Sequence, residues 1–259
     1  MREQQKVVVV GLGEVGKPLF ELASRHHEVI GVDIEPPKQR VENVDVVHIC
    51  FPFEIQNFIG EAARYIELFK PRLTIVNSTV GIGTTRAIAE RTQTPVVNSP
   101  VRGKHVRMLE ELQHYTKFVG AIDPAASQLA AKHFESMGLK TKILSSPEAT
   151  ELAKLTETTY FGLMIAWAQE VERYCDRVNQ DYAEVASFYD EIKFFPPVKY
   201  FPGVIGGHCV MPNIDILCKF EDSALLQAIK TSNQKKVARD AGKKLKAEDM
   251  KKVPAGSVR

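Results

Sequence analysis

Several features that would quickly assign a class of protein are missing from this chain. No stretch reaches the roughly 20 consecutive apolar residues of a membrane helix, and the polar start Met1–Gln5 shows no signal-peptide pattern. The four cysteines form neither a Cys-x-x-Cys pair nor a zinc-binding spacing. A net charge of +2 gives no overall attraction to nucleic acid or to a membrane surface. We therefore expect a cytoplasmic protein with reduced thiols and no bound metal.

What remains is the composition of a globular protein. Hydrophobic residues make up 44% and charged residues 25% of the 259 positions, so enough apolar side chains are available to bury a core. A chain of this length forms one large domain or two of ordinary size. The order of the motifs has to decide between the two.

The most informative motif lies at the start of the chain. Four consecutive valines at 7–10 have the length of a buried parallel strand. They run directly into Gly11-x-Gly13-x-x-Gly16, and a helix-compatible segment follows. In a dinucleotide site the first glycine allows a tight turn, the second lets the backbone approach the pyrophosphate, and the third lets helix and strand pack closely. The residues between them, whose amides would face the phosphates, are Leu12, Glu14 and Val15.

Asp33 extends this pattern. It follows the second apolar run, Glu28–Val32, where a carboxylate accepts hydrogen bonds from the adenosine ribose hydroxyls. The same negative charge would repel a 2′-phosphate, so the sequence predicts binding of NAD rather than NADP. A strand before the glycines, a helix after them and an acid at the next strand end make a stronger signal than the glycines alone.

The rest of the first half alternates apolar strands with helical patterns, which is typical of a doubly wound parallel sheet of the Rossmann type. Ligands of such sheets lie beyond the carboxyl ends of the strands. Pro52 and the pair Ser78–Thr79 should therefore line the nicotinamide half of the cleft. His48 lies inside a strand without a partner motif and is expected to be a core histidine. The expected strands are 46–50, 73–77, 95–98, 117–121 and 140–143, and the expected helices are 54–70, 84–91 and 124–137.

From residue 145 the pattern becomes entirely helical. Ser145-Ser-Pro-Glu148 has the serine, proline and glutamate of a helix start. The helical pattern continues to about Asn179, roughly 50 Å at 1.5 Å per residue, and so predicts the spine of a second domain. Further helices are expected from Asp181 and over 222–239, with a loop at 194–204. We expect an NAD-binding Rossmann domain over 1–144, a smaller all-helical substrate and dimerisation domain over 145–242, and a basic flexible tail over 243–259.

Three segments together resemble the nucleotide-sugar 6-dehydrogenase family, which includes UDP-glucose dehydrogenase and GDP-mannose dehydrogenase. Asn77-Ser-Thr-Val-Gly-Ile-Gly-Thr-Thr-Arg86 is similar to the family's STVxxGTT loop. Glu151-Leu-Ala-Lys154, followed by Thr158-Thr-Tyr160, resembles its E-x-x-K-x-x-x-N-T helix start. Pro202-Gly-Val-Ile-Gly-Gly-His-Cys209 resembles its P-G-x-x-x-G-G-H-C box, the most specific of the three. The likeness runs from Lys6 to about Asp240.

The resemblance implies oxidation of a primary alcohol to an acid with two NAD. Cys209 would add to the aldehyde, and the thiohemiacetal would be oxidised to a thioester that water cleaves. Lys154 would stabilise the alkoxide or oxyanion, and Thr79 corresponds to the family's water-positioning threonine. The family continues with a second Rossmann-like domain over the substrate nucleotide. We expect that half of the site to be absent here unless a separate subunit supplies it.

Several positions depart from the family pattern. The segment from Ser99 to His105 stands where the family has two glutamates, Thr158 stands for an asparagine, and Asn213 stands for an aspartate. A general base commonly contributes about 10²–10⁴-fold in rate, so the number of electrons transferred stays open. His105 could replace one base, because imidazole titrates near neutral pH.

Two other interpretations also stay open. Ser99-Pro-Val-Arg-Gly103 resembles the P-V-S-G-G substrate loop of β-hydroxyacid dehydrogenases, which have a lysine at the place of Lys154; Cys209 would then be a bystander in a two-electron dehydrogenase. Alternatively, the chain is a catalytically weak NAD-binding partner or sensor. The positive charges of Arg102 and Lys104, in and directly after the Ser99–Gly103 segment, favour a small anionic substrate. The helical domain is expected to form a homodimer. The expected substrate-binding residues are Ser99, Arg102, Gly103, Lys104, Thr158, Gly206, Gly207 and Asn213.

Overall fold

The structure, a computed structural model, describes residues 4–33, 41–103, 105–191, 201–206 and 209–252, with only the backbone for 105 and 243–252. The chain divides into two compact units, Met1–Leu155 and Thr156–Arg259. The expected domain boundary at 144 lies before this division, because the first turns of the long helix belong to the first unit. In the described part of the chain, no helix is both long and apolar enough to cross a membrane.

The first unit is built on a seven-stranded sheet of order β2-β1-β3-β4-β5-β6-β7. Strands β1 to β5 are parallel, β6 is antiparallel to β5, and β7 is parallel to β6. The four valines of β1, the second strand in this order, are buried, as their continuous apolar run predicts. The strands are β1 (Lys6–Val10), β2 (Glu28–Val32), β3 (Val46–Ile49), β4 (Leu73–Val76), β5 (Val96–Asn98), β6 (Lys117–Ala121) and β7 (Thr141–Ile143).

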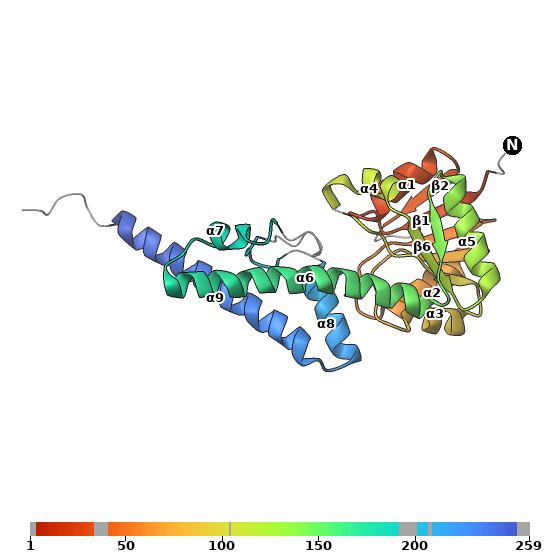
Figure 1. Ribbon diagram of the computed structural model, residues 1–259. Coiled ribbons are helices and arrows are strands. Elements are labelled where there is room, and N and C mark those ends of the chain that lie inside the picture. Colours follow the sequence, from red (N-terminus) through yellow and green to blue (C-terminus); the bar gives the residue numbers. More distant parts are fainter. Residues whose placement is uncertain (1–3, 34–40, 104, 192–200, 207–208, 253–259) are drawn as a thin grey trace, which may run out of the picture. The chain divides into compact units, whose positions relative to one another are not determined.

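Helices cover both faces of this sheet (Figure 1), so the predicted doubly wound α/β fold is confirmed, with a sheet that is mostly parallel. Helices α1, α4 and α5 pack on the face that carries Val7 and Val9, whereas α2 and α3 pack on the face that carries Val8 and Val10. The alternation follows from the two-residue period of a strand. The helices are α1 (Gly16–Ser24), α2 (Phe58–Phe69), α3 (Thr84–Thr92), the 3-10 turn η1 (His105–Arg107), α4 (Met108–His114) and α5 (Pro124–Ser136).

Two helix predictions in this unit were inaccurate. Helix α2 begins at Phe58 rather than at residue 54, because Asn57 adopts a left-handed conformation and its side chain accepts a hydrogen bond from the Gly60 amide. The short helix α4 was not predicted at all. Its buried residues Met108 and Leu112 complete the layer over the sheet, and about two helical turns gave too little periodicity to detect.

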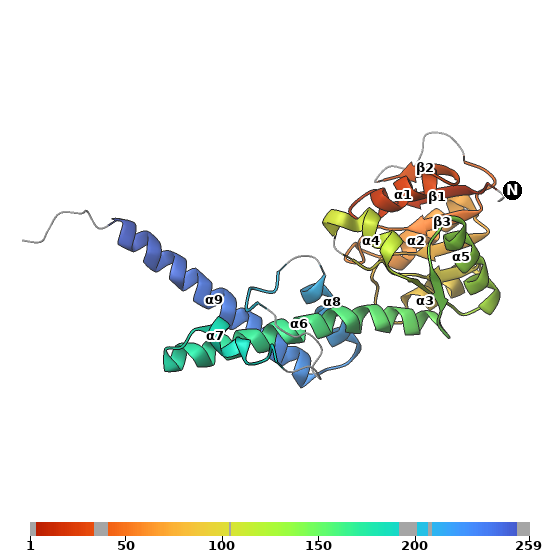
Figure 2. The same cartoon turned by 45° about the horizontal axis from the view of Figure 1, so that its top comes forward.

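The second unit contains most of α6 (Pro147–Val178) together with α7 (Tyr182–Ser187), α8 (Val210–Phe220) and α9 (Ala224–Lys252). The predicted long helix is confirmed, and its serine cap is seen in the hydrogen bond from the Ala149 amide to Ser146 Oγ. Asp181 caps α7 through the Glu184 amide, and α7 lies beside the end of α6 in both views (Figures 1 and 2).

Two expectations for the second unit were wrong. Helix α8 was not foreseen, because Pro212 in its first turn is more easily taken for a loop residue. Helix α9 continues to Lys252, so residues 243–252 are not a frayed tail. Residues 253–259 and most of the expected 194–204 loop lie outside the described residues.

Substitution of Gly16 by alanine should destabilise the first unit, because the new Cβ would overlap the carbonyl oxygen of Gly11. Overpacking of this kind costs about 1–3 kcal/mol. Gly13→Ala is the matched control, since nothing lies within 4 Å of a Cβ built there. Urea denaturation should show a lower free energy of unfolding for Gly16→Ala alone; equal values for both variants would contradict the close packing of α1 on β1.

Candidate functional site

The glycine turn between β1 and α1 has the geometry of a dinucleotide-binding loop. Gly11 has a φ of +88°, and a Cβ on it would lie 2.8 Å from the amide nitrogen of Phe51. Its own amide donates to the Val32 carbonyl at 2.8 Å, which joins the ends of β1 and β2. Gly13, by contrast, faces open space. The turn is therefore tight where backbone meets backbone and open where a phosphate would approach, so these residues fit a dinucleotide.

The predicted cofactor-binding residues of the other strands lie at the same edge of the sheet. Ser78 follows β4 and its hydroxyl donates to the Phe51 carbonyl at 2.6 Å, one residue before exposed Pro52. Thr79 is half-buried beside it, and Asp33 is exposed at the end of β2. Ser78 thus ties two strand-end loops together through its side chain, a use that its sequence motif did not indicate. Leu12 and Val15 pack against the core of the sheet, and Glu14 is exposed.

The start of α6 is fastened to the N-terminus of α3. The buried Glu151 carboxylate accepts hydrogen bonds from the amides of Gly83 at 2.7 Å and Thr85 at 2.9 Å. Burial raises the pKa of Glu151, although the hydrogen bonds from Thr85 and Gly83 oppose this effect. An anion at a helix N-terminus is favourable because four backbone amides there lack intrahelical partners.

A second carboxylate reinforces this attachment. Glu148 accepts a charge-assisted hydrogen bond from Arg86 Nε at 2.6 Å, and this bond is the main reason that the pKa of Glu148 is lowered. Lys154 lies one turn after Glu151 and is half-buried. The two glutamates therefore position this lysine in the first unit.

Lys117 is a buried cation that the sequence did not reveal as functional. It begins β6, which runs antiparallel to β5, so its side chain reaches the strand-end edge. Its Nζ donates to the carbonyl of Ser99 at 2.6 Å, to that of Pro100 at 3.3 Å and to Asn77 Oδ1 at 3.4 Å. The β5 loop, predicted to bind substrate, thus rests on an ammonium group. A lysine at the first position of an apolar strand is usually exposed to solvent, which is why Lys117 was not predicted to be functional.

Burial lowers the pKa of Lys117 to about 7; the nearby Cys50 opposes the shift and the nearby Lys154 adds to it. Burial likewise raises the pKa of the Cys50 thiol to about 12, so Cys50 stays protonated at neutral pH. Lys117 and Lys154 are therefore close enough to influence each other electrostatically. The buried Lys117 and the half-buried Lys154 thus lie near each other in the first unit.

A line of hydrogen bonds continues from Lys117 through the interior. Asn77 Nδ2 donates to His48 Nδ1 at 3.0 Å, and Nε2 of His48 lies 2.9 Å from Nε2 of His133. His133 Nδ1 lies 2.7 Å from Gln5 Oε1. All these bonds are satisfied when both imidazoles are neutral and each donates toward Gln5. Burial lowers the pKa of both histidines, that of His133 to about 3. The prediction that His48 is a core histidine is confirmed.

The basic loop after β5 is less free than its sequence indicates. The Arg102 guanidinium lies over the rings of Tyr115 at 5.0 Å and Phe118 at 5.5 Å. Gly103 has a φ of +117°, and a Cβ there would collide with Glu111. Lys104 and the side chain of His105 lie outside the described residues, so their predicted roles stay predictions.

Polar atoms without partners gather at the end of β5. Within the described part of the chain, both side-chain amide atoms of Asn98 and the hydroxyl of Ser99 are buried and make no hydrogen bond. Buried polar atoms of this kind normally bind water or a ligand, so this strand end is suited to a polar molecule.

In the second unit the structure brings three predicted residues together. Cys209 precedes α8 directly and is half-buried, and its carbonyl accepts from the Asn213 amide at 3.1 Å. Asn213 Nδ2 in turn donates to Thr158 Oγ1 of α6 at 2.6 Å. Gly206 is exposed, and Gly207 lies outside the described residues. Of the other cysteines, Cys50 and Cys175 are buried and Cys218 is half-buried.

These features define an α/β protein with the architecture of a dinucleotide-binding dehydrogenase, consisting of a doubly wound unit and a helical unit with a long leading helix. Comparison with known proteins specifies the class further. Residues 148–235 match the central domain of the UDP-glucose/GDP-mannose dehydrogenase family, which confirms the resemblance for this segment.

Similarity to known proteins extends over most of the chain. UDP-N-acetyl-D-mannosamine dehydrogenase of Methanococcus vannielii is 24% identical over 80% of this chain, and the match spans 59% of that protein. The structure of UDP-D-ManNAc dehydrogenase from Pyrococcus horikoshii shares the fold with a TM-score of 0.81 and 20% identity, over 98% of this chain and 74% of that one. The structure of 3-hydroxyisobutyrate dehydrogenase from Mycobacterium tuberculosis is similar with a TM-score of 0.70 and 15% identity. The match covers 90% of this chain and 94% of that chain.

The buried Lys117 predicts a pH-dependent stability. The unfolded chain keeps this proton up to a pKa of 10.5, whereas the folded protein loses it near 7, so unfolding takes up a proton between these values. The free energy of unfolding should therefore rise with pH above about 7, by up to about 1.4 kcal/mol per pH unit from this group. Lys117→Met should remove this slope in urea denaturations between about pH 7 and 9. Identical slopes for the two proteins would contradict the assignment of the proton to Lys117.

Proposed function

We propose that this chain is an NAD-dependent oxidoreductase of the nucleotide-sugar 6-dehydrogenase superfamily that acts on a small anionic alcohol or aldehyde. The observation that carries the proposal is a glycine turn with open space at Gly13 in a chain whose helical segment matches the family's central domain. The relatives' names make sugar nucleotides the first substrates to test. This chain spans only 59% of the relative from M. vannielii, so the activity of that whole protein is not transferred to it.

The chain's own residues would hold the cofactor as follows. Amides of the Gly11–Gly16 turn would bind the pyrophosphate, Asp33 the ribose hydroxyls, and Pro52, Ser78 and Thr79 the nicotinamide end. NAD, when bound, supplies the acceptor for the hydride. The carboxylate of Asp33 is exposed at the end of β2, where it would exclude a 2′-phosphate by charge repulsion.

Cys209 is proposed as the nucleophile. Its sulfur would form a bond with the aldehyde carbon, and the resulting thiohemiacetal would lose a hydride to become a thioester that water hydrolyses. Asn213 and Thr158, which bind each other within reach of its helix turn, would contact the substrate. Lys154 would stabilise negative charge on the substrate oxygen, and Lys117 would hold the backbone of the Ser99 loop.

A two-electron β-hydroxyacid-type dehydrogenase is the second candidate. It is favoured by the similarity in fold to 3-hydroxyisobutyrate dehydrogenase, because the match covers 94% of that chain. In that reaction Lys154 would serve the alcohol directly and Cys209 would take no part. A catalytically weak NAD-binding partner or sensor is the outcome if NAD binds without turnover.

We also propose that the helical unit packs against a second copy of itself. Tyr160, Trp167 and Tyr174 recur at every seventh position of α6 and are about half exposed, at 50%, 55% and 49%. Aromatic side chains on one face of a helix are costly to leave in water. This face is suited to a homodimer.

Thermal shift measurements test the cofactor assignment. NAD should raise the melting temperature more than NADP does, and Asp33→Ala should narrow the difference because the repelling charge is gone. Gly13→Ala should weaken both responses, since its Cβ fills the space left for the pyrophosphate. Glu90→Ala, which removes an exposed carboxylate of α3, is the control. An unchanged preference in Asp33→Ala would refute the role of Asp33.

Steady-state kinetics separate the two enzyme candidates. Cys209→Ser should abolish NADH formation from the aldehyde while alcohol oxidation persists in part, and Cys218→Ser should behave as the native enzyme. Lys154→Met should lower kcat by about 10²–10³-fold, the usual effect of removing an oxyanion stabiliser. If Cys209→Ser leaves aldehyde turnover intact, the two-electron candidate replaces the first.

A further inference from the structure

The loop before Cys209 is held by two buried carboxamides from different helices. Gln169 of α6 donates from Nε2 to the Gly203 carbonyl at 2.7 Å. Asn233 of α9 binds both backbone groups of Ile205: its Oδ1 accepts from the amide at 2.8 Å, and its Nδ2 donates to the carbonyl at 2.9 Å. Gln169 is fully buried and Asn233 is 8% exposed. The loop is thus anchored at three backbone atoms within three residues.

The two carboxamides also orient each other. Gln169 Nε2 lies 3.4 Å from Asn233 Oδ1, and Gln169 Oε1 accepts from the Ser232 hydroxyl at 3.0 Å. Every oxygen in this group therefore faces a donor and every nitrogen faces an acceptor. Neither amide can be flipped without losing bonds, so the anchor has one satisfied arrangement.

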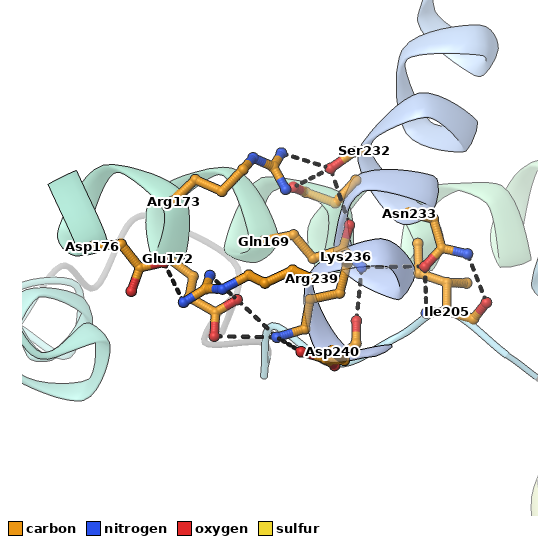
Figure 3. Close-up of polar contacts among 12 residues, drawn as sticks. Gln169, Glu172, Arg173, Asp176, Ile205, Ser232, Asn233, Lys236, Arg239 and Asp240 are labelled. Carbon is orange, nitrogen blue, oxygen red and sulfur yellow. Dashed lines mark hydrogen bonds and ion pairs between the residues drawn. The ribbon is translucent and has the colours of Figure 1, made fainter. Parts of the chain in front are cut away.

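Charged residues also join α9 to α6. Glu172 pairs with Lys236 at 2.8 Å and with Arg239 at 3.1 Å, and Arg239 also pairs with Asp176. These positions are three or four residues apart on each helix and form the polar seam shown in Figure 3. The Lys236 side chain is 8% exposed and also pairs with Asp240 of its own helix at 3.5 Å, so its buried charge has two carboxylate partners. The seam contributes to the stability of the helical unit, and its ion pairs involve no residue of the Gly203–Ile205 loop.

This arrangement bears directly on the cysteine. The buried backbone groups of a loop without regular structure need hydrogen-bond partners. Here the partners are the side-chain amides of Gln169 and Asn233, whose positions are determined by helices. Ile205 lies four residues before Cys209, and Cys209 is the residue directly before α8. We propose that Gln169 and Asn233 are positioning residues that fix the Gly203–Ile205 backbone and thereby the place from which Cys209 reaches its substrate. The link to catalysis rests on the proposed function; the anchoring does not.

The test compares Asn233→Ala with a matched variant of the same helix, Lys236→Met, which breaks the ion pairs of Lys236 with Glu172 and Asp240 but touches no loop residue. Asn233→Ala should speed hydrogen exchange of the Ile205 amide on the order of tenfold, because its acceptor is lost. It should also raise the rate of Cys209 alkylation by iodoacetamide relative to Cys218, and lower kcat with little change in KM. Lys236→Met should lower the melting temperature while leaving all three readouts near native values. Asn233→Asp, which retains the acceptor, should keep part of the exchange protection.

The proposal is overturned if Asn233→Ala and Lys236→Met lower the melting temperature alike and change exchange, alkylation and kcat only in proportion to it. A purely structural role predicts that result. If the native protein shows no dehydrogenase activity but Asn233→Ala frees the Ile205 amide and the Cys209 thiol, the anchor is supported and the proposed function fails. The exchange and alkylation readouts therefore separate the two failures.

Discussion

The close approach of α1 to the end of β1 is the constraint on which the candidate site depends. Glycine at 16 permits it, because a Cβ there would overlap the Gly11 carbonyl oxygen, and Gly11 itself leaves no room for a Cβ beside the Phe51 amide just after β3. The same geometry leaves Gly13 facing open space, with helix amides behind it. A turn that is tightly packed on one side and open on the other can bind a phosphate in the open space, where the helix amides face it.

Polar groups buried at the strand-end edge form the second level of organisation. Lys117 supports the Ser99 and Pro100 carbonyls, and Glu151 ties the start of α6 to the amides of α3. In the second unit, Asn233 accepts a hydrogen bond from the Ile205 amide and so holds the loop before Cys209. Lys117 and Asn233 each hold the backbone of an irregular loop from a regular element, whereas Glu151 holds the N-terminal turn of a helix. Functional loops are thus fixed by rigid helices and strands rather than by their own sequence.

The sequence predicted those features that depend on local pattern. The strands, the glycine turn and the long helix came from apolar runs and from glycine, serine and proline signals, and they appear with nearly the same bounds. Helix α4 and helix α8 were missed, because one is very short and the other has a proline in its first turn. Lys117, Gln169 and Asn233 were also missed, since their roles arise from contacts between distant segments that no local spacing records. The loop after β5 was expected to favour an anionic substrate; its Arg102 lies over two aromatic rings, and its role in substrate binding stays a prediction.

A crystal structure with NADH bound tests the central claim most directly. The account predicts the pyrophosphate over Gly13, the adenosine ribose at Asp33, and the nicotinamide ring beside Ser78 and Thr79 within reach of Lys154 and Cys209. A nicotinamide end blocked by the Val101–Arg107 segment, or a dinucleotide bound away from the glycine turn, would contradict it.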